Sequence, residues 1–250
     1  MPYTSNGLVR CYDEGAAAFG WKEARARAPQ PGHIKRGVGV AAGMWQGGNG
    51  GPPSTAIVKL FSDGSANLNM GASDNGCGTK TWGAQIVAEE LGVPVERISV
   101  EYADTATTQF ATPSGGSKTV PTESPAIRAA ALDVKQQLLA MAADHLKLPA
   151  SDLELRGSEV VSKSDPTKKA TLGQIPAFGR RALLVGVGYR GPNPPGKAIN
   201  PFAVQFAEVE VNTKTGEIKV LRFLAAHDSG RIMNLKTFQN QVLCDKVLFS

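Results

Sequence analysis

The sequence is poor in cysteine and histidine. Its 250 residues include three cysteines and three histidines. Cys11, Cys77 and Cys244 are widely spaced, which argues against a disulfide framework and against the clustered ligands of a zinc or iron–sulfur site. An odd number of isolated cysteines is typical of a reducing compartment, so we expect the chain in the cytoplasm, with the periplasm as the alternative.

Long hydrophobic runs are also missing from the sequence. Apolar stretches such as 131–143 are interrupted by charged or amide side chains, well before the about 20 apolar residues that a membrane helix needs. The N-terminus lacks the charged start and apolar run of a secretion signal. We therefore expect no membrane span and no leader peptide.

The charge of the chain is moderately basic, with 27 Lys and Arg against 22 Asp and Glu and a formal net charge of +5. These basic residues are scattered, with adjacent pairs such as Lys168–Lys169 and Arg180–Arg181. A nucleic-acid interface usually gathers them on one face. We therefore expect no nucleic-acid partner.

Apolar periodicity and turn signals predict an α+β fold with mixed sheets. The hairpin at 55–70 is the clearest element, because Asp63-Gly64 between two apolar runs is typical of a tight turn. The pattern changes near residue 150, which predicts an N-terminal lobe at 1–150 and a β-rich C-terminal lobe at 151–250. Further strands are predicted at 37–44, 98–102, 183–189, 202–211 and 217–226, and helices at 14–28, 82–91, 125–146, 171–178 and 236–242.

Two glycine-rich loops, at 71–81 and 113–119, each lead into a predicted helix. A strand, a glycine-rich loop and a helix in this order direct backbone N–H groups and the positive end of the helix dipole toward an anion. Ser124 is predicted to cap the second helix, with Pro125 in its first turn. Neither loop has the spacing of a P-loop or a dinucleotide fingerprint, so a loop that only needs tight turns is the alternative. Their pairing, with a lysine and several hydroxyl groups in each, favours two anion-binding loops.

The histidines do not predict a catalytic or metal site. His33, His145 and His227 are far apart in the sequence. His227 and Asp228 are adjacent, but the chain lacks the Gly-x-Ser-x-Gly motif that positions a hydrolase nucleophile. We expect neither a hydrolase triad nor protein ligands to a metal.

Four separated segments of the sequence form a further pattern. They are Gly37-Val-Gly-Val-Ala41, the run from Gly71 to Pro94, Gly115-Gly-Ser-Lys-Thr119 and the run from His227 to Val242. In this order they resemble the molybdenum-binding subunit of the xanthine dehydrogenase and aldehyde oxidase family. The resemblance covers nearly the whole chain and implies a fold like that of a molybdopterin-binding domain.

The resemblance also implies a set of cofactor-binding residues. It places the first loop beside the molybdenum and pterin, the second loop around the pterin phosphates, and a glutamine next to both pterin and metal. Many members have glutamine where this chain has Cys77, so a glutamine contact is not carried over there. The matching residues are Gly76, Cys77, Gly78 and Thr79 in the first loop, Gly115, Gly116, Ser117, Lys118 and Thr119 in the second, and Gln241.

The activity that the resemblance implies is that of an oxidoreductase component. Its family hydroxylates an aldehyde or N-heterocycle, a small-molecule substrate, with water as the oxygen source. The implied cofactor is molybdopterin with molybdenum, with the cytosine dinucleotide as one form. Electrons leave through iron–sulfur clusters and FAD, which we expect on partner chains.

The family's catalytic glutamate lies in a Gly-Glu motif beyond the segment that ends at Val242. Residues 243–250 do not continue the family pattern. We therefore expect no catalytic residue in this chain, a truncated C-terminal lobe, and no activity of the chain alone. Two alternatives stay open: a non-catalytic module that assembles with a second chain, and a generic nucleotide-phosphate-binding domain.

Overall fold

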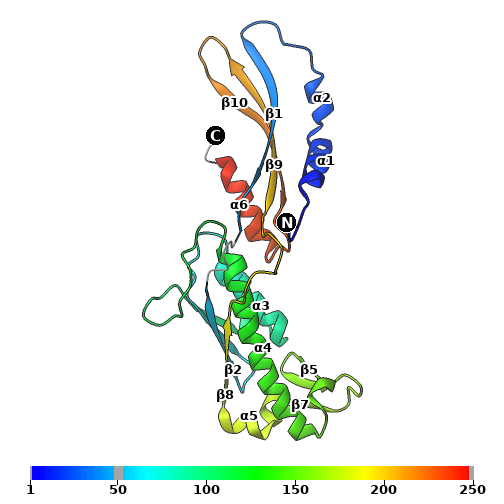
Figure 1. Ribbon diagram of the computed structural model, residues 1–250, viewed down its shortest axis with the longest axis vertical. Helices are drawn as coiled ribbons and strands as arrows, with labels where there is room; N and C mark the ends of the chain where they lie inside the picture. The colour runs from blue at the N-terminus through cyan, green and yellow to red at the C-terminus, as the bar shows by residue number, and fades with distance from the viewer. Residues whose placement is uncertain (1, 48–52, 248–250) are drawn as a thin grey trace. The chain divides into compact units, whose positions relative to one another are not determined.

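The chain forms two compact units. A computed structural model describes residues 2–47 and 53–247 (Figure 1). The terminal unit comprises Met1–Gly47 and Pro194–Ser250, and the central unit comprises Gly48–Asn193. The predicted lobes divide the chain at a different place, because strands from either side of residue 150 pair with one another within each unit.

The terminal unit is a three-stranded antiparallel sheet with two helices packed on it. Strands β1 (Ile34–Met44), β9 (Phe202–Asn212) and β10 (Ile218–Asp228) pair in the order β1-β9-β10, which confirms the strands expected there. Helix α1 (Leu8–Phe19) packs on β9 and β10, and α2 (Trp21–Arg25) packs on β1. The buried core of this unit is formed by Cys11, Phe19, Ala24, Val204 and Phe206.

The prediction of one helix at 14–28 is wrong, because two helices occupy this region and the first begins earlier. Gly20 ends α1 with a φ of 67°, and its N–H donates to the carbonyl oxygen of Ala17. Glycine adopts this left-handed conformation without the steric cost that other residues meet. The sequence prediction missed the break because Gly20 stands between two segments that both favour helix.

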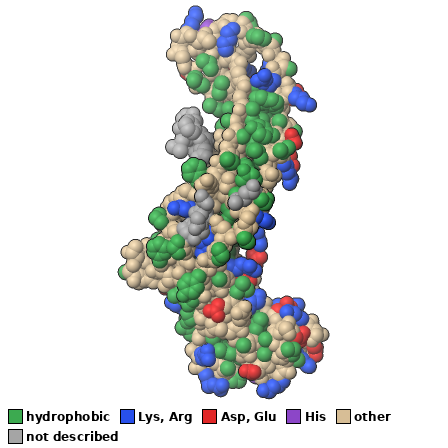
Figure 2. Space-filling view, in the orientation of Figure 1, with side chains coloured by type: hydrophobic (Ala, Val, Ile, Leu, Met, Phe, Trp, Pro, Cys, Tyr) green, Lys and Arg blue, Asp and Glu red, His purple; other side chains and the backbone are tan. Residues whose placement is uncertain are grey.

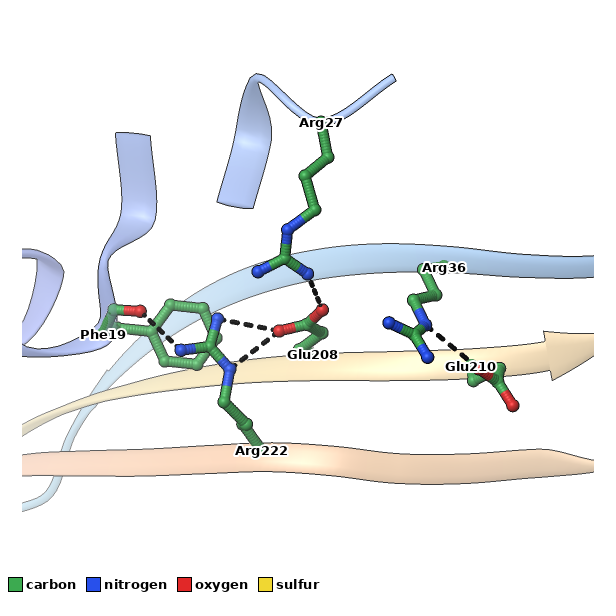
Figure 3. Close-up of polar contacts among 6 residues, drawn as sticks. All are labelled: Phe19, Arg27, Arg36, Glu208, Glu210 and Arg222. Atoms are coloured by element: carbon green, nitrogen blue, oxygen red, sulfur yellow. Dashed lines mark hydrogen bonds and ion pairs between the residues drawn. The ribbon is translucent and has the colours of Figure 1, made fainter. Parts of the chain in front are cut away.

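A buried carboxylate, Glu208, links the sheet to the helical layer of the terminal unit (Figure 3). Glu208 is 3% exposed, and its carboxylate accepts hydrogen bonds from Arg27 and, at 2.7 Å, from Arg222. The Arg222 guanidinium also lies 4.5 Å from the ring centroid of Phe19 and donates to its main-chain oxygen at 3.0 Å. Burial by itself raises the pKa of Glu208, but the hydrogen bonds and charges of the two arginines outweigh it and hold the pKa below its usual range.

Asp228, the last residue of β10, holds the start of α1 in place. Its carboxylate accepts hydrogen bonds from Ser5 Oγ and from the Gly7 N–H, each at 2.6 Å, and from the Gly230 N–H at 3.1 Å. Burial by itself raises the pKa of Asp228, but these hydrogen bonds outweigh it and hold the pKa below its usual range. Asp228 is therefore a structural carboxylate.

The substitution Asp228→Asn should lower the free energy of unfolding of the terminal unit by about 1–2 kcal/mol at neutral pH. The pKa of Asp228 is lower in the folded state than the about 3.9 of an unfolded aspartate. The carboxylate thus contributes stability above that unfolded value, and the contribution is lost as the pH falls through the folded pKa. In urea titrations at a series of acidic pH values, the wild type should lose more stability than the variant. Asp13→Asn, which removes an exposed charge from α1, serves as the control, and equal slopes for wild type and Asp228→Asn would contradict the assignment.

Helix α6 (Leu235–Val247) follows β10 in the terminal unit and includes the helix expected at 236–242. The Thr237 N–H donates to Asn234 Oδ1 at 3.0 Å, so that Asn234 caps the helix. Phe238 packs edge-on against His227, with 6.1 Å between the ring centroids. The polar stretch between β10 and α6 therefore positions a helix.

The central unit is built on a four-stranded mixed sheet (Figure 1). Strands β2 (Thr55–Phe61), β3 (Ala66–Met70), β4 (Ile98–Tyr102) and β8 (Leu183–Tyr189) pair in the order β4-β3-β2-β8. The pair β3–β4 is parallel, and the other two pairs are antiparallel. The hairpin expected at 55–70 and the strands expected at 98–102 and 183–189 are confirmed.

Helices α3 (Thr79–Leu91) and α4 (Thr119–Leu146) cover this sheet. Helix α4 approaches β8 very closely at Gly186 and Gly188. A Cβ atom on Gly188 would lie 2.0 Å from the carbonyl oxygen of Ala126, so only glycine fits there. The core between helices and sheet includes Ala56, Val58, Leu60, Leu68, Met70, Trp82, Val87, Ile127, Val134 and Leu138.

Helix α4 begins at Thr119, so the predicted start at Pro125 with Ser124 as cap is wrong. Within the helix, Ser124 Oγ donates to the carbonyl oxygen four residues earlier at 2.6 Å. Pro125 has no N–H to donate to the carbonyl oxygen of Pro121. Arg190 Nε, from just beyond β8, donates to that oxygen at 3.3 Å instead. This long-range contact explains how the helix continues through the proline.

The rest of the central unit is a small antiparallel sheet with short helical segments. Thr171 and Gln174 form a capping box, so the helix expected at 171–178 is split into a 3-10 turn and a later α-helix. These elements are η1 (Val95–Arg97), η2 (Ala150–Asp152), β5 (Leu153–Arg156), β6 (Glu159–Ser162), β7 (Lys169–Thr171), η3 (Leu172–Gln174) and α5 (Pro176–Arg181).

The surface of each unit mixes both signs of charge. On the face drawn in Figure 2, the described Lys and Arg side chains are spread over the surface, among acidic and uncharged residues. Among the helices that the structure describes, none is both long and apolar enough to cross a lipid bilayer.

Candidate functional site

Both glycine-rich loops lie at one edge of the central sheet. The strands β3 and β4 are parallel neighbours, α3 follows β3 and α4 follows β4, so the loops after these strands leave the sheet at the same edge. Two hydrogen bonds join the loops. Asn75 Nδ2 donates to the Ser114 carbonyl oxygen, and Ser114 Oγ donates to the Ser73 carbonyl oxygen, each at 3.1 Å. The fold thus brings the two predicted loops together.

The loops also meet at Gly71, immediately after β3. A Cβ atom on Gly71 would lie 2.0 Å from the carbonyl oxygen of Gln109 and 3.0 Å from Ala111 Cβ. A side chain cannot be accommodated at that distance. Gly71 therefore lets the first loop pass directly against the segment that leads to the second.

Within the first loop, Asp74 accepts the backbone N–H groups of Gly76 and Gly78, each at 3.0 Å. Both glycines have positive φ, 86° and 73°, which lets the chain turn around the carboxylate. Two backbone donors of this loop, just before α3, are therefore already used by an acidic side chain. The sequence analysis missed Asp74, although Asp-Asn-Gly is typical of a turn closed by an aspartate side chain.

The side chains of Cys77 and Thr79 lie next to each other in the first loop, with 3.1 Å between Sγ and Oγ1. Thr79 is fully buried, and its hydroxyl donates to the Ser73 carbonyl oxygen at 3.3 Å. Cys77 is a partly exposed free thiol. The polar groups of this loop are thus largely bound to one another, which gives the loop a fixed shape.

The second loop presents backbone N–H groups at the start of α4. Gly116 and Ser117 both have positive φ, 59° and 54°, which is uncommon for serine. Among the described residues, no hydrogen bond uses the N–H of Gly116, Ser117 or Thr119, and no side chain caps the helix. A Cβ atom on Gly115 would meet nothing within 4 Å. With Lys118 at the N-cap, this loop is an open and positively polarised cradle for an anion.

Several buried polar atoms in the same helices have no hydrogen-bond partner among the described residues. Glu123, near the start of α4, is 1% exposed and accepts a hydrogen bond from Ser54 Oγ, but its Oε2 is unpaired. Burial raises the pKa of Glu123, and the hydrogen bond from Ser54 offsets this only in part. Trp82 Nε1 in α3 and Thr122 Oγ1 in α4 are also buried and unpaired. Buried polar atoms are usually hydrogen-bonded in proteins, so these three atoms are exceptions among the described residues.

The remaining predicted site residue, Gln241, lies on α6 of the terminal unit, where its side chain is exposed. The part of the chain that the structure describes contains no group of three His, Cys, Asp or Glu side chains that could hold a metal ion. The site residues that the structure joins are therefore those of the two central loops.

Comparison with known proteins identifies the family of the chain that contains these two loops. The family model for the molybdopterin cofactor-binding domain matches residues 14–243. The chain belongs to the molybdopterin cofactor-binding domain family. Both loops and Gln241 lie within the matched residues of this molybdopterin cofactor-binding domain, and the resemblance and α+β fold class inferred from the sequence are confirmed.

The relatives of this molybdopterin cofactor-binding domain are larger proteins. The chain is 31% identical over 246 residues to the aldehyde oxidoreductase molybdenum-binding subunit PaoC of Escherichia coli, which covers 96% of this chain and 32% of PaoC. It is 32% identical over 192 residues to the carbon monoxide dehydrogenase large chain of Hydrogenophaga pseudoflava, covering 74% of this chain and 24% of that one. The structure of reconstituted CO dehydrogenase from Oligotropha carboxidovorans matches with a TM-score of 0.85 and 25% identity, over 96% of this chain and 33% of that chain. The chain thus spans about a third or less of the length of these relatives.

Proposed function

We propose that the chain holds a molybdopterin cofactor and forms this part of a molybdenum hydroxylase. The observation that carries the proposal is the open cradle of the second loop, with unused N–H groups at Ser117 and Thr119 and a lysine at position 118. Such a helix start attracts anions, phosphate among them, because N–H donors and the helix dipole both favour negative charge. Unpaired buried atoms at Trp82 and Thr122, in the first turns of the two helices, support a ligand at this edge.

The roles of the chain's own residues follow from these positions. The N–H groups of the second loop would hold the phosphate, and Lys118 would offset its charge. The first loop, with Gly76, Cys77, Gly78 and Thr79, would contact the pterin side, and Gln241 would contribute from α6. When bound, the cofactor supplies the redox chemistry that hydroxylates an aldehyde or N-heterocycle with oxygen from water.

We assign no catalytic base to this chain. The names of the relatives describe a molybdenum-binding subunit and a large chain, which supports a function within a larger assembly. We propose that electrons leave through iron–sulfur and FAD groups on partner chains, and that the chain alone has no turnover.

The cofactor assignment is tested by replacing Lys118. Lys118→Ala removes one charged hydrogen-bond donor, so retention of the cofactor should weaken about tenfold or more. The chain is produced in a host that makes molybdopterin, alone and with candidate partner chains, and molybdenum and pterin are measured per chain. Lys168→Ala, a lysine outside both loops, should leave the content unchanged.

The same measurement distinguishes the alternatives. If no preparation contains pterin, with or without partners, the chain does not bind the cofactor. That result would support the alternative of a non-catalytic assembly module. A rise in melting temperature with millimolar ATP or GTP would instead favour a general nucleotide-phosphate binder, because a ligand that binds only the folded state stabilises it.

A further inference from the structure

Strand β8 is an edge strand of the central sheet. It pairs with β2 on one side, and no other strand that the structure describes pairs with it on the other side. A free strand edge presents backbone N–H and C=O groups to which a strand of another molecule can add. The opposite edge strand, β4, has five residues, one of which is the charged Glu101, whereas β8 has seven uncharged residues. Strand addition is therefore favoured at β8 over β4.

The composition of β8 suits pairing with a second copy of itself. Its sequence, Leu-Leu-Val-Gly-Val-Gly-Tyr, contains no charged side chain and no proline, so two copies in antiparallel register would meet without charge repulsion. Gly186 and Gly188 face α4, so the alternating side chains of Val185, Val187 and Tyr189 lie on the other face of the sheet, where they are exposed. An added strand would bury part of this apolar face.

Two side chains of α4 already occupy the outer edge of β8, which is the side away from β2. Asp133 Oδ2 accepts the Val187 N–H at 3.2 Å, and Gln137 Nε2 donates to the Val185 carbonyl oxygen at 2.9 Å. Gln137 Nε2 also donates to Asp133 Oδ1 at 3.1 Å, so the two side chains hold each other in place. One N–H and one C=O group of the outer edge are therefore already bonded within the chain.

The backbone groups of Val185 and Val187 are the ones that an added strand would use. In an antiparallel sheet, successive residues of a strand direct their N–H and C=O groups to alternate sides. The Arg190 N–H donates to the Ser54 carbonyl oxygen, just before β2, at 3.0 Å. The even-numbered residues of this stretch therefore point toward β2, and Val185 and Val187 point outward.

The close approach of α4 to β8 lets these side chains reach the edge (Figure 1). A Cβ atom on Gly186 would lie 2.2 Å from the carbonyl oxygen of Ala130, so the helix backbone lies directly on the strand. Asp133 and Gln137 are four residues apart and therefore project from one side of α4. From this position, both side chains extend past the strand to its outer edge.

We propose that Asp133 and Gln137 block the outer edge of β8 against the addition of a strand from a second copy of the chain. A strand that paired there would have to displace both hydrogen bonds. A two-fold related copy would also bring a second Asp133 carboxylate to the same edge, where like charges repel. This inference goes beyond the proposed function, because it depends on neither glycine-rich loop and on no ligand.

The test removes both side chains in the variant Asp133→Ala with Gln137→Ala. Alanine keeps the helix propensity of α4. In sedimentation velocity over a concentration series, the variant should self-associate about tenfold or more strongly than the wild type, because strand addition no longer displaces two hydrogen bonds. Amide hydrogen exchange should locate the contact, because the N–H groups of Val185 and Val187 should gain protection as the concentration of the variant rises.

Two matched variants control for the loss of polar side chains. Gln136→Ala with Asp144→Ala removes an exposed amide and an exposed carboxylate from the same helix, and should leave both self-association and the exchange of β8 at wild-type values. Adding Val185→Lys to the Asp133→Ala, Gln137→Ala variant should abolish its self-association, because a charged side chain on an edge strand opposes pairing.

If the double variant does not fold, Gln137→Ala alone decides, because it still releases the Val185 carbonyl oxygen. Its self-association should be about threefold or more stronger than that of the wild type. Folded variants that sediment like the wild type at every concentration would overturn the proposal, and so would association that leaves the exchange of β8 unchanged. Concentration-dependent protection of Val185 in the wild type would also contradict it, since the edge would then be open with both side chains present.

Discussion

Replacing Gly188 by alanine should destabilise the central unit by about 3 kcal/mol or more. The new Cβ atom would lie 2.0 Å from the Ala126 carbonyl oxygen and 2.2 Å from the Ala130 nitrogen. Both are backbone atoms of α4, so the helix itself must move away from β8. Because α4 carries the second loop at its start, the displacement should also lower cofactor retention. Amide hydrogen exchange along α4 and the molybdenum content of the chain would report the two effects.

A matched glycine distinguishes steric conflict from a general effect of alanine. Gly191 follows β8 closely, and a Cβ atom there would meet nothing within 4 Å. Gly191→Ala should therefore leave both the hydrogen exchange of α4 and the cofactor content near wild-type values. Unchanged exchange in Gly188→Ala would show that α4 does not pack on β8 as described.

Replacing Arg222 by methionine should cost the terminal unit about 3–5 kcal/mol. The substitution leaves Glu208 buried with only Arg27 as a charged partner, and it also removes the contact of Arg222 with Phe19 (Figure 3). A buried charge without full compensation is more costly than the loss of an exposed ion pair. Urea unfolding of the terminal unit, followed by the exchange of β9 and β10 amides, would measure the loss.

The double variant Glu208→Leu with Arg222→Met tests whether the buried charge causes this loss. Because it removes the buried carboxylate that Arg222→Met leaves with Arg27 alone, it should recover most of the stability lost in Arg222→Met. Arg10→Met, which breaks an exposed ion pair with Glu14 in α1, should change stability by less than about 0.5 kcal/mol. A double variant no more stable than Arg222→Met would show that the contact with Phe19 dominates.

Local signals predicted those elements whose structure is set by neighbouring residues. The hairpin at 55–70 follows from Asp63-Gly64, which specifies its own turn. The start of α4 could not be predicted in this way, because Pro125 is typical of a first helical turn and the partner of the Pro121 carbonyl oxygen, Arg190, is distant in the sequence. The break at Gly20 was hidden because residues on both sides favour helix.

The candidate site could be predicted only in part, because local signals specify its loops but not the contacts between them. The glycine-rich loops are visible in the sequence, but their proximity depends on β3 and β4 being parallel neighbours, which local patterns do not specify. The spacing of residues by itself favoured an anion at each of the two loops. The hydrogen bonds from Gly76 and Gly78 to Asp74 were not predicted from that spacing.

The insertion of the central unit between β1 and β9 determines the order in which the chain can fold during synthesis. Strand β1 leaves the ribosome long before its partner β9, whereas every strand of the central sheet is complete before β9 begins. At roughly 5–20 residues per second, β1 waits on the order of ten seconds or more without its neighbour. Gly37, Gly39 and Gly43 lower the β propensity of this waiting strand and so its tendency to pair with another nascent chain. The glycines of β1 thus reduce the tendency of the chain to pair with other nascent chains during synthesis, before β9 is available to β1.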